Sequence, residues 1–239
     1  MKDILGTALL DFYHGKYTED IITETNISEE DILPLPYFFR THAEMPQIER
    51  KALQLSKGKV LDIGCGAGCH ALYLQEKGLP VTAIDTSEGA VEVCTLRGIK
   101  DARCIDLIRL ENEKFDTILL LMNGTGIFQK LEFISVFLDH LKSLLTPKGQ
   151  ILIDSSDLRY MYDEGEDGGI WIPGDSYYGE LEFSMKYKGE ESDVFDWLYL
   201  DERIFETACI ASGLHFEVLT RGENFDYLAR ITVAENNPA

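Results

Sequence analysis

From about residue 45 onward, the chain alternates between two hydrophobic periodicities. Nearly continuous apolar runs are typical of strands buried on both faces of a sheet, whereas apolar positions three and four residues apart predict helices. The predicted strands are 59–63, 81–84, 102–105, 115–121, 150–154, 214–220 and 225–233. The predicted helices are 45–55, 69–77, 87–98, 128–144 and 201–213. This order predicts a doubly wound α/β fold, with a mostly parallel seven-stranded sheet that is closed by a hairpin.

Two segments interrupt this alternation. The first is 1–44, and one helical face in it is formed by Ile4, Leu5, Ala8, Leu9 and Phe12. It predicts an N-terminal helical cap that either covers the edge of the core or forms a lid over a ligand. The second is 155–200, where alternation at 181–187 and an apolar run at 194–200 predict an inserted β-hairpin. We therefore expect a cap at 1–44 and a main domain at 45–239 with the hairpin insert at 155–200.

A glycine-rich turn stands at the centre of the predicted sheet. The apolar run 60–63 ends in glycines at alternate positions, Gly64, Gly66 and Gly68, and a helical pattern follows at once. Glycine lets the backbone turn sharply and lets a ligand approach where a Cβ atom would collide. The helix start adds free backbone N–H groups that face the same point. Strand, glycine turn and helix together are typical of a nucleotide-binding βαβ unit.

The spacing of the turn resembles motif I of the class I S-adenosylmethionine-dependent methyltransferases. It reads Asp62-x-Gly64-x-Gly66-x-Gly68, whereas the dinucleotide fingerprint G-x-G-x-x-G would need a glycine where Cys69 stands. The resemblance covers 58–154 and, by pattern only, 201–233. It implies the strand order 3-2-1-4-5-7-6 with the seventh strand antiparallel, and S-adenosylmethionine as cofactor, with S-adenosylhomocysteine as its product.

The resemblance also implies positions for the cofactor. The acid after the second strand, Asp85, would bind the ribose, and the residues after the third and fourth strands would flank the adenine and the methyl donor. Arg40 would meet the cofactor carboxylate as a charge-assisted pair. The expected cofactor-binding residues are Asp62, Gly64, Cys65, Gly66, Gly68, Asp85, Thr86, Asp106, Leu107, Met122, Asn123 and Arg40. For Asp106 an ordinary loop acid, and for Asn123 a turn former, are the alternatives.

The acceptor side is less defined, because methyl transfer from a sulfonium depends mainly on orientation and needs a base only if the acceptor must lose a proton. The expected substrate-binding residues are Tyr37, Asp154, Tyr178 and Trp197. Further candidates at the end of the fifth strand are Ser155 and Asp157. Candidate bases are His14, His42, Tyr177 and Tyr178, and no catalytic residue can be assigned among them. No cluster of metal ligands is expected.

The charge and cysteine content of the chain bear on its partners and its compartment. The chain has 239 residues, of which 42 are acidic and 22 are basic, so its net charge is −20. Such a field repels nucleic acids and anionic membranes and disfavours both as partners. The five cysteines show no zinc or C-x-x-C spacing and are read as reduced thiols of a cytoplasmic protein. Neither a secretion signal nor a membrane helix is predicted.

The sequence therefore predicts a methyltransferase that acts on a small molecule, as a monomer or a homodimer. A non-catalytic S-adenosylmethionine-binding regulatory or partner module is one alternative, and a NAD-dependent oxidoreductase is another. The second strand of the insert is apolar on both faces, so we expect it to cover something on each side. With residues 35–42 it would form the acceptor wall, the alternative being a dimer interface.

Overall fold

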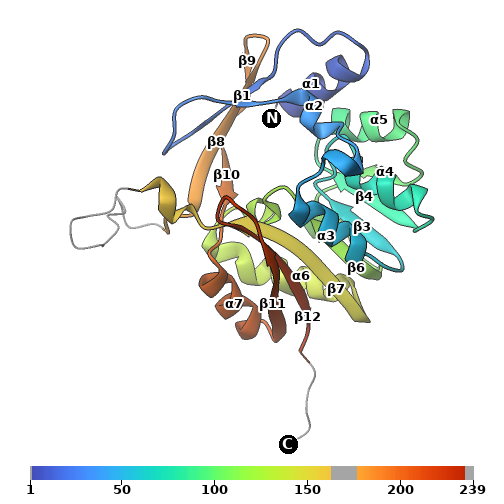
Figure 1. Cartoon of the computed structure of the whole chain (residues 1–239), viewed down its shortest axis with the longest axis vertical. Helices are drawn as coiled ribbons and strands as arrows, with labels where there is room; N and C mark the ends of the chain where they lie inside the picture. The colour runs from blue at the N-terminus through green and yellow to red at the C-terminus, as the bar shows by residue number, and fades with distance from the viewer. Residues whose placement is uncertain (1, 163–176, 235–239) are drawn as a thin grey trace, which may run out of the picture.

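The computed structural model describes residues 2–162 and 177–234 (Figure 1). Its centre is a seven-stranded sheet in the order β11-β12-β7-β6-β3-β4-β5. These strands are β3 (Val60–Ile63), β4 (Val81–Asp85), β5 (Ala102–Cys104), β6 (Phe115–Leu120), β7 (Leu145–Ser156), β11 (Leu214–Arg221) and β12 (Asp226–Val233). β12 is antiparallel to both neighbours, and the other pairs are parallel. The predicted sheet, with its antiparallel last strand, is confirmed.

Helices cover both faces of this sheet. They are α3 (Gln47–Leu55), α4 (Cys69–Glu76), α5 (Glu88–Leu96), α6 (Ile134–Leu144) and α7 (Glu202–Ala211). Neighbouring residues of a central strand belong to different cores: Leu61 to the core that includes side chains of α6 and α7, and Val60 to the core that includes side chains of α3 and α4. Because both faces are covered, β3 is buried at every position, which explains its continuous apolar pattern.

The helix expected at 128–144 begins six residues later. Gln129 has a positive φ of 66°, which interrupts the helical path before α6. Two short 3-10 turns, η3 (Gly124–Phe128) and η4 (Leu131–Phe133), occupy the preceding stretch. This region lies directly after β6, so it belongs to the edge where the strands end.

A second, smaller sheet lies next to the main sheet, beside α1 (Ile4–Tyr13) and α2 (Leu35–Phe38) (Figure 1). Its order is β10-β8-β1-β2, with the short β9 on β8. The strands are β1 (Ile21–Thr25), β2 (Asp31–Leu33), β8 (Glu180–Tyr187), β9 (Glu190–Glu191) and β10 (Phe195–Leu198). The predicted hairpin insert is present as β8 to β10, and residues 163–176 of the insert lie outside the described residues.

The segment 1–44, expected to be a helical cap, contains strands as well as helices. Helices occur at α1 (Ile4–Tyr13) and α2 (Leu35–Phe38), with a 3-10 turn, η1 (His42–Glu44), but residues between α1 and α2 form β1 and β2. β1 pairs antiparallel with β8, which is far away in sequence. Local periodicity cannot reveal a strand whose partner lies in the distant insert. The N-terminal segment and the insert are therefore one structural unit.

Asp3 attaches the start of the chain to the main domain. One of its carboxylate oxygens accepts the backbone N–H of Gly6 and caps α1, and the other accepts the N–H of Gly89 and the hydroxyl of Ser87 at the start of α5. α1 and α5 approach closely at two glycines, since a Cβ atom on Gly89 would lie 2.6 Å from the backbone of Gly6. The helix that follows β4 is thus held by the N-terminal segment.

Across residues 2–162 and 177–234, no helix is long and apolar enough to cross a membrane.

We predict that Asp3→Ala destabilises the protein by about 1–2 kcal/mol, because it removes the side-chain acceptor at the starts of two helices. Urea unfolding followed by circular dichroism measures the change. The matched control is Asp139→Ala, which removes an exposed carboxylate from α6 and should stay within about 0.5 kcal/mol of the parent protein. Equal stability of the two variants would contradict the double-capping role.

Candidate functional site

The glycine turn after β3 adopts the conformation that the sequence predicts. Gly64, Gly66 and Gly68 have φ values of +69°, +52° and +79°, a region that side-chain-bearing residues rarely adopt. A Cβ atom on Gly68 would lie 2.3 Å from Ile99, so this glycine is needed for packing. A Cβ atom on Gly66 would meet only Phe38, at 3.4 Å, and the protein alone therefore leaves room there.

Asp62 is a buried carboxylate with an unused oxygen. The residue is 2% exposed, and its Oδ2 atom has no hydrogen-bond partner among the described residues. Burial raises the pKa of Asp62 to about 6, although His70 and a backbone bond from Ala71 act in the opposite direction. An isolated buried acceptor of this kind is costly unless a donor or cation meets it. The amino group of the expected cofactor has the chemistry that fits.

Asp85, at the end of β4, connects the glycine turn with the next helix. Its carboxylate accepts the N–H of Gly66 at 2.9 Å and the N–H of Ser87 at 2.9 Å. Burial raises the pKa of Asp85, and these backbone bonds oppose the rise. Each oxygen can accept a further bond, so the carboxylate is suited to hydroxyl groups. The neighbouring Thr86 is exposed.

The residues after β5 have clear local roles. Asp106 is exposed and accepts the N–H of Ile108, capping a 3-10 turn, η2 (Leu107–Arg109). Leu107 is 4% exposed and belongs to the main core. The assignment of both residues to the adenine stays a prediction.

A strained turn follows β6. Met122 and Asn123 have φ values of +69° and +59°, which is uncommon for residues other than glycine. Asp154, at the end of β7, accepts the N–H of Asn123 at 3.0 Å and that of Gly124 at 2.9 Å. The side chain of Asn123 donates to the carbonyl of Leu198 at 3.3 Å. Asn123 therefore has a turn-forming role, and its expected cofactor contact stays a prediction.

Arg40 is engaged within the protein. It is 6% exposed and donates from Nε to Oε2 of Glu49 at 3.1 Å, while His70 meets the same oxygen at 2.7 Å. Burial opposes the ionised form of Glu49, but bonds from His70 and Arg40 keep its pKa below the usual value. Burial would likewise lower the pKa of His70, but Cys69 and Glu49 raise it well above its usual value. The expected contact of Arg40 with a cofactor carboxylate would therefore compete with Glu49.

A cavity of about 260 Å³ opens where β6 and β7 end and β12 begins. It is lined by Tyr37, Pro46, Ile48, Glu49, Met122, Asp154, Ser156, Asn224 and Asp226. Three residues singled out from the sequence meet here, namely Tyr37, Met122 and Asp154. A hollow of about 430 Å³ lies near Gly78, Pro80 and Lys100, at the opposite end of β4, away from the glycine turn and from this cavity.

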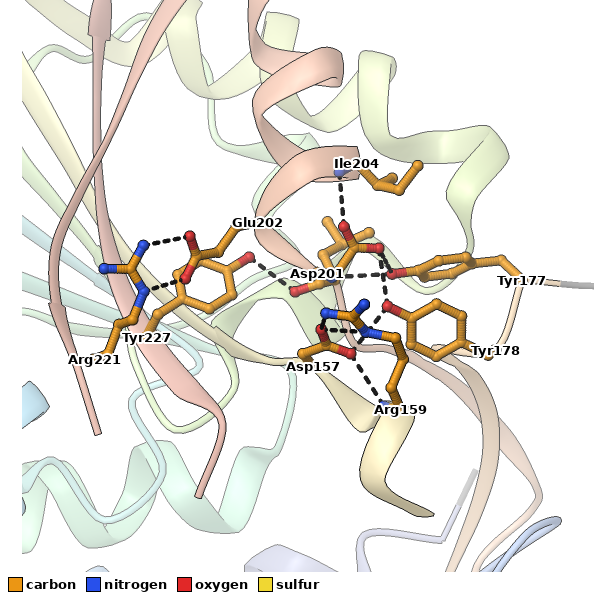
Figure 2. Close-up of polar contacts among 10 residues, drawn as sticks. Asp157, Arg159, Tyr177, Tyr178, Asp201, Glu202, Ile204, Arg221 and Tyr227 are labelled. Atoms are coloured by element: carbon orange, nitrogen blue, oxygen red, sulfur yellow. Dashed lines mark hydrogen bonds and ion pairs between the residues drawn. The ribbon is translucent and has the colours of Figure 1, made fainter. Parts of the chain in front are cut away.

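Tyr177 and Tyr178 lie in a separate polar cluster (Figure 2). Both phenols lie within hydrogen-bonding distance of Asp201, at 2.7 and 3.0 Å, and that of Tyr178 is also 3.0 Å from Asp157, which pairs with Arg159. Burial raises the pKa of both tyrosines far above the ordinary value, which opposes a role as base. The cluster fixes the described end of the insert to the start of α7.

The remaining sequence candidates are also placed outside the lining of the 260 Å³ cavity. Trp197 covers η3, since a Cβ atom on Gly126 would lie 1.9 Å from its ring. Ser155 is buried; its hydroxyl accepts the backbone N–H of Leu200 and forms a hydrogen bond with the hydroxyl of Thr125. His42 stacks on Tyr73, with ring centroids 4.1 Å apart, and His14 is exposed at the end of α1.

Sequence reasoning missed Glu49, His70 and Asp226. Glu49 had a detectable signal, because it lies on the buried face of α3 together with Ile48 and Ala52, where a charged residue is unusual. Asp226 gave no such signal, since an acid beside a turn is ordinary. Among the described residues, no group of three or more His, Cys, Asp or Glu side chains could hold a metal ion.

The chain is similar in sequence and in structure to known methyltransferases. A family model described as "Methyltransferase domain" matches residues 61–153. A crystal structure of a SAM-dependent methyltransferase from Bacteroides fragilis, in complex with S-adenosyl-L-homocysteine, is 46% identical with a TM-score of 0.91. The match covers 98% of this chain and 96% of that chain.

More distant relatives agree in the central region. The ubiquinone biosynthesis O-methyltransferase of Rickettsia typhi is 28% identical over 106 residues, 42% of each chain. That of Rickettsia prowazekii is 32% identical over 107 residues, 42% of this chain and 41% of its own. The chain thus matches about two-fifths of the length of these curated relatives. DesVI of Streptomyces venezuelae, at 17% identity and a TM-score of 0.56, shares the fold; the match covers 81% of this chain and 92% of that chain.

We predict that Asp62→Asn changes stability in a pH-dependent way. The folded pKa of about 6 lies above the unfolded value of about 3.9, so the stability that Asp62 contributes falls as the pH rises through that interval. The neutral amide does not titrate. The variant should therefore gain about 1 kcal/mol relative to the parent protein between pH 5 and pH 8.

Urea unfolding across this pH range, without added ligand, measures the difference. Asp139→Asn, on the exposed face of α6, supplies the baseline for removing a carboxylate that is not buried. A difference between Asp62→Asn and the parent protein that stays constant over the range would contradict the raised pKa.

Proposed function

The chain belongs to the S-adenosylmethionine-dependent methyltransferases, and we propose that it binds S-adenosylmethionine and transfers its methyl group to a small-molecule acceptor. The observation that carries this proposal is Asp62, whose buried Oδ2 atom lacks a partner beside a glycine turn that leaves room for a ligand. The bound S-adenosylhomocysteine of the Bacteroides fragilis relative supports the same cofactor here.

Residues at the ends of three strands would each contact a different part of the cofactor or acceptor. Asp62 would accept hydrogen bonds from the cofactor's amino group, and Asp85 would accept them from ribose hydroxyls. Met122 and Asn123 would form the wall nearest the reacting groups, held there by Asp154. When bound, the cofactor supplies a methyl group attached to a sulfonium sulfur, and this sulfur leaves readily as a neutral thioether. The protein then needs mainly to orient the acceptor in line and to exclude water.

Compartment and assembly form part of the same proposal. A cytoplasmic location is supported by the five cysteines, all of which are free thiols. We propose that the protein acts as a monomer or a homodimer.

Calorimetry with S-adenosylmethionine, S-adenosylhomocysteine and NAD tests the binding step. We expect one site for the first two ligands and no heat with NAD. A folded protein that binds neither adenosyl ligand would overturn the proposal. Binding without any methylated product across a broad acceptor panel would instead favour the non-catalytic module.

We predict that Gly66→Ala lowers the affinity for S-adenosylhomocysteine at least tenfold, because the added Cβ atom enters the space left for the ligand. The matched control is Gly78→Ala. Gly78 also has a positive φ, +85°, and has no atom within 4 Å of an added Cβ, so both variants carry similar backbone strain. Only Gly66→Ala should lose affinity in calorimetry, and equal affinities would show that the ligand does not approach this glycine.

A further inference from the structure

The 260 Å³ cavity has negative charges that the described part of the protein does not neutralise. Three carboxylates line it, from Glu49, Asp154 and Asp226. Glu49 is neutralised by Arg40 and His70. Within residues 2–162 and 177–234, by contrast, no lysine, arginine or histidine forms an ion pair with Asp154 or Asp226.

Of these two carboxylates, we consider Asp154 first, because its ionised form is costly to bury. It is 9% exposed, and its two oxygens accept one backbone N–H each, which leaves further acceptor capacity on both. A buried carboxylate without a cation is costly, so it is stabilised either by a proton or by a positive ligand. Burial accordingly raises the pKa of Asp154 to about 6. At neutral pH a cationic ligand in the cavity would remove this cost.

One aromatic residue lines the cavity, and an exposed aromatic pair lies next to it in the chain or stacked on that neighbour. Tyr37 is part of the lining, and one face of its ring is covered by the Arg40 guanidinium, 4.0 Å from the ring centroid. Phe225 is not part of the lining but stands between two lining residues in the chain, Asn224 and Asp226. Phe225 is 63% exposed and stacks on Tyr160, itself 54% exposed, with ring centroids 5.0 Å apart. Exposed aromatic faces attract cations, and carboxylates beside them strengthen the attraction. The carboxylates of the lining are poorly suited to an anionic acceptor, and the aromatic rings are compatible with a cationic one.

We propose that the methyl acceptor is an aliphatic amine, which enters this cavity as an ammonium ion and is held by Asp154 and Asp226. The inference rests on the methyl transfer proposed above and adds the acceptor class and the residues that select it. The volume suits a small amine or the amine-bearing end of a larger molecule that extends past Phe225 into solvent.

The chemistry follows from the charge of the amine. The ammonium ion first loses one proton to the Asp154 carboxylate, which gives a neutral amine and a carboxylic acid. The nitrogen lone pair then forms a bond to the sulfonium methyl carbon, and the electrons of the carbon–sulfur bond go to sulfur. The products are an N-methylated ammonium ion and a neutral thioether. Asp154 later returns its proton to water.

Matched pairs of probes test the acceptor class. Each pair has an amine and the alcohol of the same skeleton: putrescine and 1,4-butanediol, benzylamine and benzyl alcohol, tyramine and tyrosol, glucosamine and glucose. Binding is measured by calorimetry with saturating S-adenosylhomocysteine, and transfer is measured by mass spectrometry with S-adenosylmethionine. We expect at least one amine to bind at least tenfold more tightly than its alcohol and to become N-methylated.

An alcohol or phenol that binds as well as its amine, or is methylated in its place, would overturn the proposal. So would a protein that binds S-adenosylhomocysteine but none of the amines. Either result leaves the proposed methyl transfer standing, whereas failure to bind S-adenosylhomocysteine at all would count against the proposed function itself.

Two variants test the residues. Asp226→Asn should weaken amine binding at least tenfold and leave the S-adenosylhomocysteine affinity within about twofold. Asp154→Asn should weaken amine binding at least tenfold as well, and by a larger factor than it weakens S-adenosylhomocysteine binding, because Asp154 also holds the turn at Asn123 and Gly124. The control is Glu217→Gln. It removes a carboxylate on the edge strand β11 that pairs with Arg230, and it should change neither amine binding nor S-adenosylhomocysteine affinity. Asp226→Asn keeps the test valid if Asp154→Asn fails to fold.

The other cation that could meet Asp154 is the sulfonium itself. If so, Asp154→Asn would lower the affinity for S-adenosylmethionine relative to S-adenosylhomocysteine, which lacks that charge, and would leave amine binding unchanged. This outcome, or unchanged amine binding in both variants, would refute the assignment.

Discussion

The arrangement of the site depends on carboxylates that bind backbone N–H groups of neighbouring turns. Parallel strands end at one edge, where the turns that follow them leave backbone groups without partners in the sheet. Asp85 accepts a bond from Gly66 of the glycine turn, and Asp154 accepts bonds from Asn123 and Gly124 of the turn after β6. Each strand end thus positions the turn of the strand beside it. The position of one turn cannot change without affecting its neighbour.

Much of this could be predicted from the sequence, because it depends on local pattern. Continuous apolar runs identified the central strands, and the spacing from Asp62 to Gly68 identified the turn and its ligand class. The rest depends on contacts between distant residues. β1 needs β8 as its partner, and the pairing of Glu49 with Arg40 and His70 needs three separate elements. Tyr178 was expected in the acceptor site, but its hydrogen bonds to Asp157 and Asp201 could not be deduced from composition or periodicity.

The acids of the site fall into two groups with different physical roles. Glu49 has its cations within the protein, so it stabilises the fold and joins α3 to the start of α4. Among the described residues, Asp62 and Asp154 form no ion pair, although His70 acts on both from a distance, and burial disfavours their ionised forms. The proposed affinity for positive groups would arise from this second group, because binding would offset a cost that the folded chain already carries. The net negative charge of the whole chain strengthens the same preference at longer range.

The pairing of β1 with β8 has a consequence for synthesis of the chain. The paired residues, such as Thr25 and Phe183, are about 160 positions apart. At a typical elongation rate the ribosome needs roughly 10 to 30 s to add that length, so β1 emerges long before its partner exists. During this interval its edge is open to pairing with other chains. Glu24 on this strand, and the acids Glu29, Glu30 and Asp31 that follow it, place charge where intermolecular strand pairing would otherwise begin.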